Sequence, residues 1–141
     1  MRGKWKPKLD DKFRLTLPAQ YRAELASGVT VVCAQENCLA VYVIAVLEEI
    51  LKPINAAPST LVEVRDYQRW MQYSAVDTIP DKQGRIILTF DQRKWAELER
   101  EVVIIGAGDR LEVWNPDRWD AYALALDAKF TNFNGEIVPR S

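Results

Sequence analysis

The sequence of 141 residues predicts an α+β fold, mainly β with peripheral helices, made of two tandem repeats. Residues 9–22 align with 80–93 at an offset of 71, and the alignment continues between 29–42 and 101–114 at an offset of 72. Each copy contains short runs rich in β-branched and aromatic residues, which are typical of strands. Each copy is followed by a stretch in which apolar residues recur at helical spacing.

Each repeat is expected to form the same elements in the same order. A first strand leads into a tight turn at the motif Asp-x-x-x-Arg, and a second strand leaves it, RLTL in the first copy and RIIL in the second. A short helix follows, and two strands close the unit. Pro18 suits the first turn of that helix in the first copy, because a proline has no N–H group to donate there.

Further helices are predicted after each repeat. The stretch AVLEEILKPI is expected to form a helix that ends at Pro53, and a second helix is expected over 60–75 with Ser59 or Thr60 as its N-cap. After the second repeat, Asn115 is predicted to cap a helix with Pro116 at its first position. The apolar stripe of this helix, which we expect to pack on the core, consists of Trp119, Tyr122, Ala123 and Leu126.

This organisation divides the chain into four segments. Residues 1–55 hold the first repeat with its following helix, 56–76 a linker helix, and 77–130 the second repeat with its following helix. The tail, 131–141, shows no periodicity. We expect it to be loosely ordered or, because it contains VPRS, to be a protease-site remnant of an expression vector.

Composition narrows the classes of function. The chain has no histidine and only two cysteines, Cys33 and Cys38, which we expect to be buried thiols on adjacent strands. Two thiols are too few ligands for a structural zinc site. The sequence also shows no nucleophile–base pair of the kind that would indicate an enzyme. No apolar run approaches the roughly 20 residues that cross a bilayer, and no secretion signal is recognised. We expect a cytosolic protein that is not an enzyme, with no metal, cofactor, membrane or small-molecule substrate.

Charge is unevenly distributed along the chain. Residues 1–22 hold seven Lys or Arg against two Asp, a net charge of +5, whereas the remainder holds 12 basic and 18 acidic residues, a net charge of −6. This asymmetry predicts a basic tip on an acidic body. Charge alone leaves open the alternative that these lysines only protect a sheet edge from pairing.

The Asp-x-x-x-Arg motif contains the main candidate binding residues. Asp10 and Asp81 are expected to accept backbone N–H groups and so to stabilise the turn. Arg14 and Arg85 begin the outgoing strand just after the bend. Each guanidinium could pair with its own Asp or reach outward, and the spacing leaves both outcomes open.

The residue before each motif arginine differs between the copies. Gly84 in the second copy can adopt the φ angles that such a turn often requires. Phe13 occupies this position in the first copy, so the turn there must avoid a strained φ angle or stack the ring on a neighbour.

Lysines beside the first bend favour a nucleic-acid partner. Lys8 and Lys12 flank the bend, and alternation along the incoming strand places Lys4, Lys6 and Lys8 on one face. A two-stranded β-ribbon with a basic face fits the DNA major groove, where arginine can read guanine with two hydrogen bonds. The candidate DNA-binding residues are Arg14, Arg85, Lys12, Lys8, Lys82 and Lys6.

These motifs resemble those of the MraZ family, bacterial transcription factors with two tandem AbrB-like swapped-hairpin repeats. The resemblance rests on LDDKFRLTLPAQYR, IPDKQGRIILTFDQR, LAVY and LEVWNPDRWDAY, and covers roughly residues 3–126. It implies a double-split β-barrel made by both repeats, and subunits that assemble into a ring homo-oligomer. It also implies that Arg14 and Arg85 are the motif arginines, with Asp10 and Asp81 as their partners. Phe13 departs from the small or polar residue expected at its position.

The resemblance also implies a function. The protein would regulate transcription, as a repressor of the bacterial division and cell-wall gene cluster that includes its own gene. It would bind direct repeats of double-stranded DNA in the promoter and associate with the nucleoid. The alternative is an antitoxin-like AbrB-fold module that binds a toxin protein as well as DNA. Such antitoxins usually carry one repeat and a partner-binding tail, whereas this chain has two repeats and a short tail.

Overall fold

The computed structural model describes residues 1–131. The first half contains β1 (Arg2–Trp5), β2 (Arg14–Thr16), the 3-10 turn η1 (Ala19–Tyr21), α1 (Arg22–Leu25), β3 (Val29–Cys33), the 3-10 turn η2 (Gln35–Asn37), β4 (Leu39–Val43), α2 (Ile44–Ala56) and α3 (Val62–Ser74). The second half contains β5 (Val76–Thr78), β6 (Arg85–Ile87), α4 (Phe90–Trp95), β7 (Val103–Ala107), β8 (Leu111–Trp114) and α5 (Pro116–Thr131). The prediction for the tail falls outside the described residues, except for Thr131, which ends α5.

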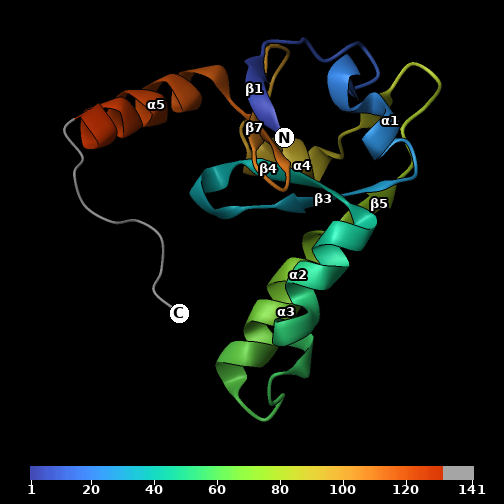
Figure 1. Ribbon diagram of the computed structural model, residues 1–141, viewed down its shortest axis with the longest axis vertical. Helices are drawn as coiled ribbons and strands as arrows, with labels where there is room; N and C mark the ends of the chain where they lie inside the picture. Colours follow the sequence, from blue (N-terminus) through green and yellow to red (C-terminus); the bar gives the residue numbers. More distant parts are fainter. Residues whose placement is uncertain (132–141) are drawn as a thin grey trace.

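The strands form two antiparallel sheets that mix the repeats (Figure 1). Six strands pair in the order β1-β7-β8-β4-β3-β5, and β2 pairs with β6 as a separate ribbon. The first strand of each repeat pairs with the third strand of the other, β1 with β7 and β5 with β3. The predicted α+β class is confirmed, and so is the order strand, bend, strand, short helix, two strands in each repeat.

The main core lies between the six-stranded sheet and the β2/β6 ribbon. Leu15 and Ile86 reach it from the ribbon, and Val31, Val41 and Ile104 reach it from the sheet. Burying a side chain of this size stabilises the fold by about 1.5–3 kcal/mol. Because side chains of both repeats fill this one core, the two repeats depend on each other for stability.

The α2/α3 hairpin projects from the sheet (Figure 1) and corrects two predictions. α2 continues through Pro53 to Ala56, because the proline removes only one backbone hydrogen bond close to the end of the helix. α3 begins at Val62 with Leu61 as its N-cap and no side-chain cap, so neither residue 59 nor residue 60 caps it. The amide of Leu61 donates to the carbonyl of Pro58, and this turn delays the start of the helix.

The helix α5 is capped as predicted and packs in part as predicted. The side-chain oxygen of Asn115 accepts the amide N–H of Arg118 at 3.1 Å. Trp119 and Tyr122 contact Trp114, with ring centroids 5.3 and 5.1 Å apart. Beyond this point the helix leaves the body (Figure 1), and none of its residues is buried. The expected core packing is therefore confirmed at Trp119, which packs against the buried cluster of Cys38, Val103 and Trp114, although no residue of the stripe is itself buried.

The two cysteines are buried free thiols, as predicted. Cys33 ends β3 and Cys38 immediately precedes β4. Burial raises the pKa of Cys38 to about 12 and also raises that of Cys33, so both stay protonated at neutral pH. Within residues 1–131, no helix combines the length and apolar character needed to cross a membrane.

Candidate nucleic-acid interface

The first Asp-x-x-x-Arg bend is held by the carboxylate of Asp10. Its Oδ1 accepts the backbone amides of Lys12 and Arg14, each at 2.9 Å, and its Oδ2 accepts Nε of Arg14 at 2.6 Å. The amide of Phe13 also donates to the carbonyl of Asp10 at 3.0 Å, which closes the turn. One side chain thus satisfies three donors and fixes where the outgoing strand begins.

The second bend repeats this geometry. Oδ1 of Asp81 accepts the amides of Gln83 and Arg85 at 3.0 and 2.9 Å, and Oδ2 accepts Nε of Arg85 at 2.8 Å. The amide of Arg85, and in the first bend that of Arg14, holds the pKa of the aspartate below its usual range. Both carboxylates therefore stay charged at neutral pH and keep their arginines oriented.

The spacing left open whether each motif arginine pairs with its own aspartate or reaches outward. Each guanidinium pairs with its own Asp, yet 29% of the Arg14 side chain and 25% of the Arg85 side chain stay exposed. Nη1 of Arg85 also lies 3.9 Å from Oδ2 of Asp10, so the two bends meet. Nε is used within each bend, and part of each side chain remains accessible to solvent.

The β2/β6 ribbon brings the two arginines together. In its register Arg14 lies opposite Ile87 and Thr16 lies opposite Arg85, while the intervening pair, Leu15 and Ile86, points into the core. The outward face therefore carries one arginine from each repeat at diagonal positions. Two strands that lie 71 residues apart in the sequence pair to form this face. The local sequence therefore does not reveal it.

A second pair of arginines packs on the bends, each on the bend of the other repeat. Arg93, from the second repeat, lies over the ring of Phe13 with Cζ 3.5 Å from the ring centroid. Arg22, from the first repeat, lies against Gly84, where an added Cβ would be 2.5 Å from its Nε. Sequence reasoning did not assign Arg22 and Arg93 to the site. The repeat alignment, which pairs them, was the signal that could have found them.

Phe13 adopts a strained φ angle, and its ring also stacks on a neighbouring side chain. Its φ angle is 60°, and that of Gly84 at the equivalent position is 75°. A non-glycine residue in this region costs about 1–2 kcal/mol. The guanidinium of Arg93 over the ring offsets part of this cost through a cation–π contact.

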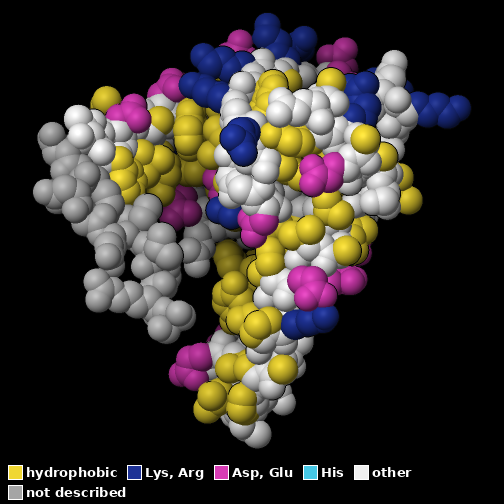
Figure 2. Space-filling model, in the orientation of Figure 1, with side chains coloured by type: hydrophobic (Ala, Val, Ile, Leu, Met, Phe, Trp, Pro, Cys, Tyr) yellow, Lys and Arg dark blue, Asp and Glu magenta, His cyan; other side chains and the backbone are white. Residues whose placement is uncertain are grey.

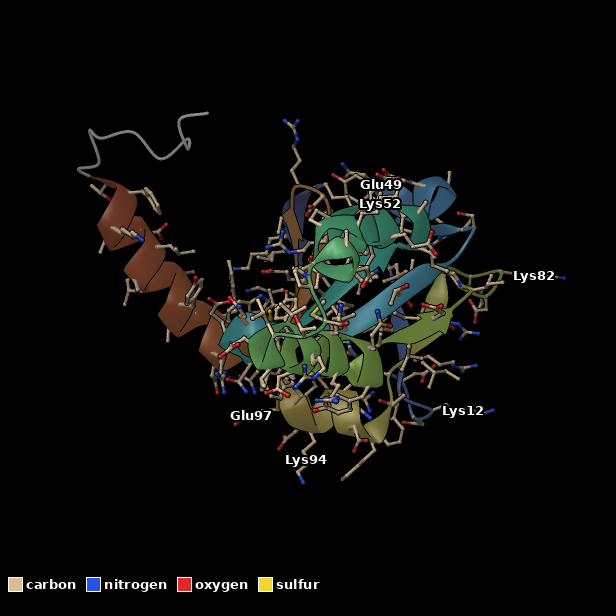
Figure 3. The ribbon with its side chains drawn as sticks, turned by 90° about the horizontal axis from the view of Figure 1, so that it is seen from below. Lys12, Glu49, Lys52, Lys82, Lys94 and Glu97 are labelled. Atoms are coloured by element: carbon tan, nitrogen blue, oxygen red, sulfur yellow. The ribbon has the colours of Figure 1, made fainter. Side chains whose placement is uncertain are left out.

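The lysines surround the two bends. Lys12 and Lys82 project from one side of the molecule, the side opposite α5 (Figure 3). β1 ends at Trp5, because Pro7 has no N–H group for the ladder, so the predicted incoming strand is shorter than expected. The alternation persists beyond it, and Leu9 is buried. The exposed side chains of this segment are those of Lys4, Lys6 and Lys8.

Charge is concentrated on this end of the molecule. Lys and Arg side chains gather around β1, α1 and the adjoining bends, opposite the α2/α3 hairpin (Figure 2). Among the residues that the structure describes, no group of three or more Cys, Asp or Glu side chains is arranged to hold a metal ion. The arrangement is a basic surface with two fixed arginines, which suits binding of an anionic polymer.

Comparison with known proteins places this chain among bacterial regulators. The model of one family, described as "MraZ protein, putative antitoxin-like", matches residues 1–70 and again 71–136. A protein of Parafrankia sp. (strain EAN1pec) named Transcriptional regulator MraZ is 42% identical over 137 residues, 97% of this chain and 96% of its own. Proteins of the same name from Kocuria rhizophila and Nocardioides sp. are 40% and 44% identical, over 97% and 94% of this chain and 96% and 92% of theirs.

Proposed function

This chain belongs to the MraZ family, and from this premise we propose that it regulates transcription by binding double-stranded DNA through the β2/β6 ribbon and its two bends. The observation that supports this most is the diagonal pair, Arg14 and Arg85. Both are oriented by a carboxylate and partly exposed, and the lysine of each bend, Lys12 or Lys82, projects from the same side of the molecule (Figure 3).

The two kinds of basic residue have different roles in this proposal. The lysines, Lys6, Lys8, Lys12 and Lys82, contact phosphates and release counterions, which makes the affinity depend on salt. The arginines enter the major groove, where a guanidinium can donate two hydrogen bonds to guanine. Asp10 and Asp81 position the arginines rather than contact DNA. The acidic remainder of the chain interferes little, because charges are screened over about 8 Å at physiological salt.

We place this activity at the promoter of the gene cluster for cell division and the cell wall that includes the protein's own gene. There it binds direct repeats and represses by occluding the promoter, in the cytoplasm and in association with the nucleoid. The family resemblance, and the name that the relatives carry, support this assignment.

A mobility-shift titration tests the proposed function. The pure protein is mixed with the DNA fragment upstream of its own gene at several salt concentrations, with a coding fragment of equal length as control. We expect binding of the upstream fragment at physiological salt and a steep linear fall of log affinity with log salt. Equal affinity for both fragments, or no retardation at low salt, would refute the proposal.

Self-association would multiply these contacts. A ring of subunits presents several ribbons to successive direct repeats, and the effective concentration converts weak contacts into useful affinity. The apolar stripe of α5 supports such an assembly, because none of its residues is fully buried within residues 1–131. The stripe packs on Trp114 near the start of the helix, and the later turns of the helix extend away from the sheets (Figure 1). Hydrophobic side chains also gather along α5 and the α2/α3 hairpin (Figure 2).

Light scattering of the pure protein is expected to give a mass several times that of the 16.2 kDa chain. Leu126→Glu should lower this mass, because it places a charge in the stripe that the neighbouring subunit covers. Leu124→Glu is the matched control, since Leu124 lies on another face of the same helix. A monomeric wild type, or equal masses for both variants, would contradict this assembly.

The antitoxin-like alternative is retained because the description of the family includes it. It predicts a protein partner in addition to DNA. Co-purification of a second protein in stoichiometric amount would favour it.

A further inference from the structure

The two arginines of the ribbon have different neighbours, although the repeat relates them. Ile87 faces Arg14 across the ribbon, Phe13 precedes Arg14 in the chain, and the guanidinium of Arg93 links Phe13 to Phe90. We name the three apolar side chains, Phe13, Ile87 and Phe90, the Arg14 collar. Subtracting or adding the offset of 71 gives the residues at the equivalent positions around Arg85: Gly84, Thr16 and Ala19. One arginine thus has large apolar neighbours, and the other has small or polar ones.

The members of the Arg14 collar are connected across the ribbon and through Arg93. Ile87 lies directly opposite Arg14 in the ribbon. The guanidinium of Arg93 joins the other two members, 3.5 Å from the ring centroid of Phe13 and 5.7 Å from that of Phe90. Phe13, Ile87 and Phe90 are 43%, 60% and 65% exposed, so they cover little of the core.

Stability does not account for the Arg14 collar. Phe13 has a φ angle of 60°, which is unfavourable for any residue that carries a side chain. The second copy has a glycine at the equivalent position. Local strain of this kind is concentrated at functional sites. Exposed apolar side chains in the middle of a basic surface also bring no benefit in water, which favours a contact with an apolar group of a bound partner.

We propose that the Arg14 collar contacts the methyl group of a thymine next to the guanine that Arg14 reads. The two ends of one ribbon would then recognise different base pairs. This inference rests on the proposed function, because it assumes that the ribbon enters the major groove. In that groove the C5 methyl of thymine is the apolar group that the base edges offer, and aromatic and aliphatic side chains bind it. At the Arg85 end, the positions equivalent to the collar hold the small or polar residues Gly84, Thr16 and Ala19.

Thymine and deoxyuridine differ only by this methyl group, which gives a direct test. The wild-type protein selects duplexes from a random-sequence pool, and one selected duplex is synthesised again with deoxyuridine at each thymine in turn. We expect about a fourfold loss of affinity at one thymine beside a guanine in each bound repeat, the effect of one buried methyl group. The other replacements should have little effect.

Variants assign the effect to the Arg14 collar. Phe13→Gly and Ile87→Thr each introduce the residue that the other repeat carries, so the fold already accommodates both. We expect each variant to bind the thymine and deoxyuridine duplexes with more nearly equal affinity. Tyr73→Ala is the control, because it removes a 78% exposed aromatic ring from α3, outside the ribbon, and should keep the fourfold difference.

The outcomes separate the two proposals. If the wild type selects no duplex, the proposed function fails and this inference fails with it. If it selects duplexes but binds thymine and deoxyuridine equally, or if Phe13→Gly keeps the full difference, only the thymine contact is refuted. A fall in the oligomeric mass of Phe13→Gly, with the thymine preference unchanged, would instead identify the Arg14 collar as a contact between proteins.

Discussion

Replacing Arg14 by alanine is expected to weaken binding of the upstream DNA fragment by roughly 10- to 100-fold at physiological salt. The variant loses a base contact worth about 1–3 kcal/mol, together with one positive charge. The mobility-shift titration described above measures the loss. A change limited to the slope of affinity against salt would mean that Arg14 contacts only phosphate.

The fold should survive this substitution, which makes the result interpretable. Without the guanidinium, Asp10 still accepts the backbone amides of residues 12 and 14, which any side chain at position 14 allows. Circular dichroism and the oligomeric mass should therefore match those of the wild type. Arg14→Lys is the matched control for charge, because lysine keeps the charge but lacks the planar fork that makes two parallel hydrogen bonds. Unchanged binding by Arg14→Ala would remove this residue from the interface.

Gly106→Ala is expected to give the largest loss of stability that a single added methyl group can cause in this fold. A Cβ at position 106 would lie 2.4 Å from the backbone N and Cα atoms of Arg2, where β7 pairs with β1. Because these are backbone atoms, no side chain can rotate to make room. We expect the free energy of unfolding to fall by about 1–3 kcal/mol, measured by chemical denaturation.

The same variant should also affect DNA binding, because β1 leads into the lysines that flank the first bend. A detached β1 would leave Lys4 and Lys6 without a fixed position and reduce the salt dependence of the affinity. Gly108→Asn is the control. A Cβ there meets no atom within 4 Å, and asparagine tolerates a positive φ angle better than most residues. If Gly106→Ala were as stable as the wild type, the close pairing of β1 with β7 would not persist in solution.

Local chemistry made the bends predictable. An aspartate four residues before an arginine can accept the amides of a tight turn whatever the rest of the chain does, and both copies form these bonds. Asn115 capped its helix for the same reason, since a cap depends on neighbours within three residues. The predictions at residues 53 and 59–60 failed because a turn at Pro58 and one tolerated proline outweighed weak local preferences.

The burial of side chains was harder to predict from the sequence than the turns and helix caps. The stripe of α5 has the spacing of a core-facing helix, yet within residues 1–131 none of its residues is buried, and Trp119 only packs against the edge of a buried cluster. Periodicity shows that a helix has an apolar face, but it does not show which surface covers that face. The Arg14 collar was missed for a related reason, because Ile87, which faces Arg14, and Phe90, which Arg93 links to Phe13, come from a segment more than 70 residues away.

By itself, the sequence determined two repeats, the Asp–Arg bends, the main strands and the family to which the chain belongs. Only the tertiary structure decided that the repeats exchange strands, that Arg22 and Arg93 cross to the opposite bends, and that the two arginine ends have unlike surroundings. The physical reason is the separation along the chain of the residues that interact. Turns and caps form between neighbours in the chain, whereas strand exchange and exposure depend on the competition of all apolar side chains for one shared core.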